Sequence, residues 1–127
     1  MSIIDLFTFP HFYFMLSTLL LISIGIYFVL AHNPENWFFL HKLFMGLGLI
    51  VAIVGLIVVG ALRLTIIHAI LGLITVILLT LSIIGGLYAT KKQEKKLRTG
   101  HIWFGRLVYL VALIVIIIGI LTFLGII

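Results

Sequence analysis

Four apolar stretches, each long enough to cross a lipid bilayer, constrain the fold of this chain more than any other feature. They cover residues 9–31, 37–60, 64–89 and 101–125. A helix needs about 20 consecutive apolar residues to span the hydrocarbon core, and 65% of this chain is hydrophobic against 9% charged. The sequence therefore predicts an all-α integral membrane protein, an antiparallel bundle of four transmembrane helices forming a single domain over residues 1–127.

The basic residues predict how the helices are oriented. Most of them lie between the third and fourth apolar stretches: Lys91, Lys92, Lys95, Lys96 and Arg98. Because cytoplasmic loops are enriched in Lys and Arg, we expect loops 32–36 and 90–100 in the cytoplasm and both termini on the extracytoplasmic side. Orientation and contact with anionic lipid then account for the net charge of +5, and nucleic acid is not an expected partner.

Four of the five histidines occur once in each apolar stretch, near its N-terminal end. They are His11, His41, His68 and His101. Since successive helices run antiparallel, His11 and His68 are expected near the extracytoplasmic face and His41 and His101 near the cytoplasmic face. Steps of 4, 7, 11 and 14 residues from each histidine stay on one helix face, where small and weakly polar residues gather. The histidine faces are therefore expected to point into the bundle.

Each histidine pair is suited to bind one haem b through two axial imidazoles, with two haems in all. A residue that is small or flexible follows each histidine by one turn and would leave room for the flat ring: Met15, Met45, Gly72 and Gly105. Three cations near the membrane faces are expected to contact the haem propionates: Arg63, Lys42 and Arg106. The chain has no cysteine, which excludes covalent haem attachment through C-x-x-C-H.

The spacing of the histidines indicates a repeat. His11 and His68 are 57 residues apart, and His41 and His101 are 60 apart, so the two halves look like one helical hairpin used twice. At 1.5 Å per residue the two levels should differ by roughly 20 Å. Two macrocycles at that spacing would let electrons tunnel across the membrane.

Other interpretations use the same residues differently. Zinc would lack ligands, because each face offers two histidines and the chain has only Asp5, Glu35 and Glu94 as carboxylates. That scarcity also excludes a di-iron carboxylate bundle. A small haem-free channel or scaffold stays an alternative of another class, although a proton pathway would favour mid-membrane carboxylates. His32, outside the quartet, is a turn residue or a contact near the inner site.

Several short motifs resemble the cytochrome b561 family, especially the four-helix haem core found joined to DOMON domains. "HAILGL" with a later "GGL" and "HIWFGR" with a later "GI" are similar to the family's third and fourth core helices. "WFFLHK" resembles the start of its second helix, and "HFYFM" resembles its opening His-x-x-x-Met. The likeness covers nearly the whole chain.

The resemblance implies transmembrane electron transfer through two b haems, with His11 and His68 as ligands of the extracytoplasmic one and His41 and His101 of the cytoplasmic one. Three positions depart from the family pattern: Phe12, His32 and Ser82. His32 replaces an arginine that helps ascorbate-using members bind their reductant, so ascorbate is not the expected donor.

The expected function is therefore that of a dihaem electron conduit, working alone or as the haem-bearing membrane anchor subunit of a larger oxidoreductase. Its donor and acceptor would be quinol, a small reductant or a redox protein that docks at a membrane face. Lipid surrounds the helices, and contact with copies of itself or with partner subunits is expected of so small a bundle.

Overall fold

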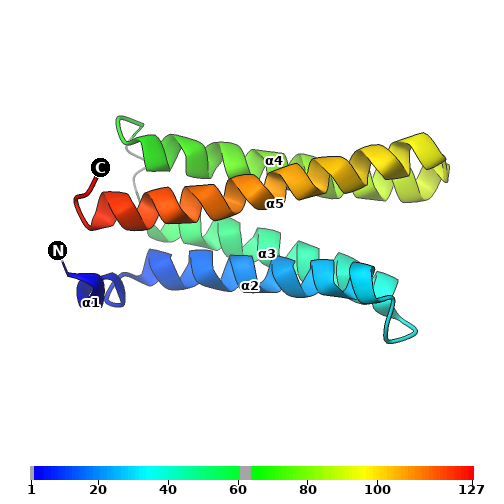
Figure 1. Cartoon of the computed structure of the whole chain (residues 1–127), viewed down its shortest axis with the longest axis horizontal. Coiled ribbons are helices and arrows are strands. Elements are labelled where there is room, and N and C mark those ends of the chain that lie inside the picture. The colour runs from blue at the N-terminus through cyan, green and yellow to red at the C-terminus, as the bar shows by residue number, and fades with distance from the viewer. Residues whose placement is uncertain (1, 61–63) are drawn as a thin grey trace. The chain divides into compact units, whose positions relative to one another are not determined.

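The computed structural model describes residues 2–60 and 64–127, which are helical almost throughout (Figure 1). A short helix, α1 (Ile3–Leu6), precedes four long ones. These are α2 (Pro10–Ala31), α3 (Trp37–Val58), α4 (Ile67–Lys92) and α5 (Lys95–Phe123), each long and apolar enough to cross a membrane. The predicted fold class, an all-α membrane protein with four membrane-spanning helices, is confirmed.

The chain divides into two compact units, Met1–Leu62 and Arg63–Ile127. In each unit two long helices run antiparallel and pack against each other, α2 with α3 and α4 with α5. We call these units the first and the second hairpin and describe each by itself. The single domain and the joining of the two hairpins into one bundle stay predictions.

Local backbone chemistry fixes the helix ends. Pro10 occupies the first turn of α2, where its missing N–H costs nothing. At their other ends α2 and α4 stop at a left-handed residue, His32 (φ 51°) and Gln93 (φ 55°). The N–H of each donates to the carbonyl four residues earlier, at Phe28 and Ala89, as in a helix C-cap.

The fourth membrane helix begins earlier than expected. The sequence predicted it from residue 101, with residues 90–100 as a loop, whereas α4 continues to Lys92 and α5 starts at Lys95. Only Gln93 and Glu94 connect them. Hydropathy reports the part of a helix that lies in lipid, but Lys, Arg, Leu and Glu are also good helix formers in water. Arg98 and His101 consequently belong to one continuous helix.

Glycines allow α2 and α3 to pack closely against each other. A methyl group at Gly48 would lie 2.7 Å from Ile22 Cγ2, and one at Gly25 would lie 3.0 Å from Met45 Sδ. Gly25, Gly48, Ala52 and Gly55 are buried, as is common where membrane helices pack through small residues. The opposite faces expose Ile, Leu, Val and Phe, which suits contact with lipid acyl chains.

Gly48→Ala should destabilise the first hairpin by about 1 to 3 kcal/mol, because the β-branched Ile22 cannot move its γ-methyl group cheaply. Gly46→Ala is the matched control, since a methyl group there meets no atom within 4 Å. It should be neutral or stabilising, as Ala favours helix. Thermal unfolding of both variants in detergent measures the difference, and equal melting temperatures would contradict the packing argument.

Candidate functional site

In the first hairpin, each membrane histidine is hydrogen-bonded to the backbone of the opposite helix. His11 Nδ1 on α2 lies 3.0 Å from the carbonyl oxygen of Gly55 on α3. His41 Nδ1 on α3 lies 2.9 Å from the carbonyl oxygen of Gly25 on α2. The two contacts are reciprocal and lie at opposite ends of the hairpin, because the helices are antiparallel.

The second hairpin repeats this arrangement. His68 Nδ1 on α4 lies 3.1 Å from the carbonyl oxygen of Val115 on α5. The His68 ring also lies against Gly119, where a methyl group would be 2.8 Å from Nδ1. At the other end the His101 ring lies against Gly86 of α4, where a methyl group would be 2.7 Å from Cε1. All four histidine rings therefore contact the other helix of their own hairpin.

The carbonyl contacts determine which ring nitrogen carries the proton. A carbonyl oxygen only accepts hydrogen bonds, so Nδ1 of His11, His41 and His68 must be the donor. In a neutral imidazole the other nitrogen, Nε2, then holds the lone pair. Metal-binding histidines are commonly oriented in this way, by an Nδ1–H donated to a backbone carbonyl. When neutral, the three rings therefore have the tautomer that leaves Nε2 able to bind a metal ion.

One spacing rule relates the contacts in both hairpins. The accepting carbonyl lies fourteen residues after the histidine of its own helix: Gly25 after His11, Gly55 after His41 and Val115 after His101. Fourteen residues of helix span about 21 Å. Each hairpin therefore holds its two histidines at levels about 21 Å apart, in agreement with the separation expected from the sequence.

The same rule shows a repeat inside each hairpin that the sequence analysis missed. Both helices of the first hairpin contain H-x3-M-x9-G, in residues 11–25 and 41–55. Both helices of the second contain H-x3-G-x13-G, in residues 68–86 and 101–119. Comparing consecutive helices, rather than the two halves of the chain, would have shown it.

The two hairpins differ in the residue that follows each histidine by one turn. In the first hairpin Met15 and Met45 follow the histidines by one turn, and each lies against the glycine of the opposite helix, Gly55 or Gly25. In the second hairpin Gly72 and Gly105 replace these methionines. A methyl group at Gly72 would meet no atom within 4 Å, and one at Gly105 would meet only the Ser82 hydroxyl, at 3.7 Å. Within the second hairpin, Gly72 therefore borders open space, whereas a methyl group at Gly105 would be in ordinary contact with Ser82.

The predicted propionate contacts are placed less favourably. The Lys42 ammonium lies over the Phe38 ring, 4.7 Å from its centroid, and the Arg106 guanidinium lies over the Trp103 ring, at 4.8 Å. These cation–π contacts hold both side chains along their own helices. Arg63 lies outside the described residues.

A cleft of about 550 Å³ opens between α4 and α5 beside His101. Its lining combines small and aromatic residues with a few polar side chains: Ser82, Gly85, Tyr88, Glu94, Lys96, Leu97, Gly100, His101 and Phe104. In the first hairpin, the His32 ring packs edge-on against Trp37, with centroids 4.4 Å apart. His32 is thus a helix cap with an aromatic neighbour.

Comparison with known proteins identifies no relative, since no family model, curated protein or solved structure matches the chain. Within residues 2–60 and 64–127, no three His, Asp or Glu side chains gather as they would around a single metal ion. The predicted ligand pairs, His11 with His68 and His41 with His101, each take one histidine from each hairpin. The pairing therefore stays a prediction.

The tautomer assignment can be measured directly. In haem-free protein labelled with 15N-histidine, His11, His41 and His68 should show a protonated Nδ1 and a lone pair on Nε2, because the backbone carbonyls fix the proton. His32, which is exposed, serves as the internal control and should show the tautomer mixture of an unconstrained imidazole. Protonated Nε2 at the three membrane histidines would contradict the assignment.

The two glycines that contact the histidine rings of the second hairpin provide a second prediction. Gly86→Ala and Gly119→Ala should each displace the imidazole that lies on them and destabilise the second hairpin by about 1 to 3 kcal/mol. Gly85→Ala is the neighbouring control, since a methyl group there meets no atom within 4 Å. Thermal unfolding and the 15N spectrum of the displaced histidine report the effect. Wild-type stability and spectra of the first two variants would show that glycine is not required beneath these imidazole rings.

Proposed function

We propose that this chain binds two haem b groups and carries electrons across the membrane. His11 and His68 would hold one haem, and His41 and His101 the other. The observation that carries the proposal is the imidazole geometry within each hairpin: Nδ1 donates to a backbone carbonyl, which leaves the lone pair on Nε2. The resemblance to the cytochrome b561 family points to the same four residues.

The donor set and its surroundings fit this cofactor. Neutral imidazole nitrogens are ordinary axial ligands of haem iron, and the four histidines, two in each hairpin, would supply two ligands for each of two haems. Open space over Gly72 in the second hairpin suits the close approach of a flat ring. When bound by two imidazoles, haem b supplies a one-electron iron couple.

The residues of the chain would act by holding geometry constant. The hydrogen bonds of His11, His41 and His68 to helix backbones keep each ring in one orientation and one tautomer. The rigid span of about 21 Å between the levels in each hairpin sets the distance that an electron would cross. Apolar side chains around the helices keep water and ions away from the path.

The electron donor and acceptor would meet the chain at its two membrane faces. A quinol, a small reductant or a docking redox protein would serve, and lipid would cover the exposed apolar faces of the helices. The same site also suits a haem-bearing anchor subunit of a larger oxidoreductase. Orientation with the basic α4–α5 turn in the cytoplasm is part of the proposal.

An absorption spectrum of the purified full chain, expressed with haem available, tests the proposal. We expect a Soret band that shifts on dithionite reduction, the α bands of six-coordinate haem b, and two haems per chain. A colourless, haem-free preparation would contradict the proposal and favour a haem-free channel or scaffold.

Histidine variants test the pairing. His68→Ala and His101→Ala should each lower the haem content from two to one per chain. The double variant His11→Ala/His68→Ala should keep one haem, whereas His11→Ala/His101→Ala should keep none, because each haem needs both of its imidazoles. His32→Ala is the control and should keep two. One haem remaining in both double variants would overturn the assigned pairs.

A further inference from the structure

The cations near the cytoplasmic end of α5 differ in their direction around the helix. Because an α-helix turns about 100° per residue, Arg98 lies about 60° from His101 on the helix surface. Lys95, Lys96 and Arg106 each lie about 120 to 140° away from it. Arg98 and His101 therefore share one face, as residues at positions i and i+3 do.

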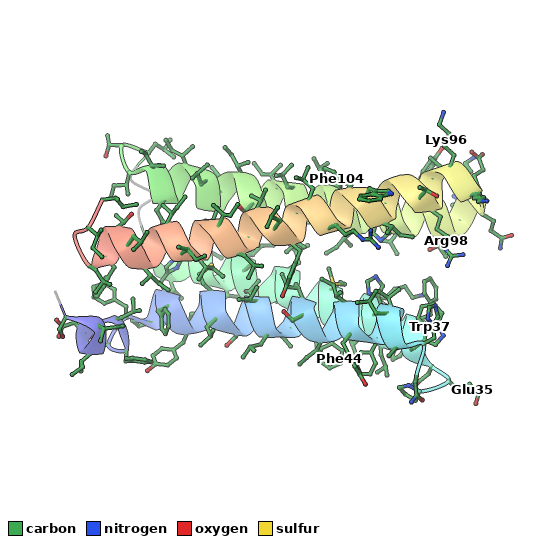
Figure 2. The ribbon with its side chains drawn as sticks, in the orientation of Figure 1. Glu35, Trp37, Phe44, Lys96, Arg98 and Phe104 are labelled. Atoms are coloured by element: carbon green, nitrogen blue, oxygen red, sulfur yellow. The ribbon has the colours of Figure 1, made fainter. Side chains whose placement is uncertain are left out.

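These directions apply because Arg98 and His101 belong to one helix, α5. α5 begins at Lys95, and the Arg98 N–H donates to the Glu94 carbonyl over 3.1 Å, so Arg98 belongs to the first turns of the same helix as His101. Figure 2 shows the side chains of Lys96 and Arg98 leaving α5 on opposite sides. Lys96 lines the cleft together with Gly100, His101 and Phe104.

The cations also differ in how deep they lie along their helices. Arg98 is one turn, about 4.5 Å, closer than His101 to the polar N-terminal end of α5. Arg106 is five residues deeper into the apolar segment and lies over Trp103. Lys42 is one residue deeper than His41 and lies over Phe38, and Lys92 lies over Tyr88 at 5.8 Å.

We infer that the Arg98 guanidinium binds a carboxylate of the haem ligated by His101. The inference rests on the proposed function. Haem b carries two propionates on one edge, and that charged edge would favour the side nearer to water. A guanidinium on the histidine face and one turn nearer to water meets that edge, and its planar pair of N–H groups matches a carboxylate in two-point contact. Arg98 would hold the carboxylate edge of the cofactor, and His101 would bind its iron.

The test is the rate at which haem leaves the full chain for an excess of apomyoglobin, with His101→Ala used to assign the kinetic phase of the cytoplasmic haem. Arg98→Gln should speed that phase about two- to fivefold, the range for a solvent-exposed ion pair, and leave the other phase unchanged. Arg98→Lys should restore part of the retention. Lys95→Gln, a cation about 120° from His101 around the helix, should match wild type, whereas the effect appearing in Lys96→Gln, which lines the cleft with His101, would contradict the inference.

Haem dimethyl ester, which lacks free carboxylates, identifies the group that Arg98 contacts. With this cofactor, wild type and Arg98→Gln should lose haem at equal rates. A persistent difference between them, an Arg98→Gln rate equal to wild type with ordinary haem, or the effect appearing in Arg106→Gln instead would overturn the inference while the proposed function stands. A wild-type chain without haem would overturn the proposed function itself.

Discussion

The hydrogen bond from an imidazole Nδ1 to a backbone carbonyl of the neighbouring helix is the interaction on which the rest of this structure depends. It links the two helices of a hairpin across an apolar interface, where an unsatisfied polar group is costly. It also selects the tautomer that leaves a lone pair on Nε2. One contact therefore fixes the helix register and prepares the nitrogen for the chemistry that we propose.

This contact requires close helices, and the glycines provide the closeness. Gly25 and Gly55 accept the hydrogen bonds and also leave room for Met45 and Met15. In the second hairpin the glycines lie under the imidazole rings instead, at Gly86 and Gly119. A stripe of small residues is common in membrane helices, but here its members are placed by the position of a histidine on the opposite helix.

Much of this could be predicted from the sequence. Hydropathy located most ends of the four spans to within a few residues. Steps of fourteen from three of the four histidines reached Gly25, Gly55 and Val115, which supply the accepting carbonyls. Hydropathy could not find the start of α5, because its first two turns are charged yet helical. Lys42 and Arg106 are close in sequence to a histidine, but closeness in sequence does not give the direction of a side chain, which changes by about 100° per residue around a helix. The sequence therefore did not predict that both side chains lie along their own helices.

The repeat within each hairpin has a consequence for the direction of electron flow. In the first hairpin, both helices carry the same histidine spacing and each imidazole Nδ1 donates to a glycine carbonyl, so the two ends offer similar imidazole environments. Within that hairpin, the proposed ligands therefore do not distinguish a donor end from an acceptor end. The ends differ chiefly in charge, since five cations surround the α4–α5 turn, and positive charge stabilises a reduced centre. In the proposed electron conduit, a preferred direction of electron flow would then come from this difference in charge and from the partners.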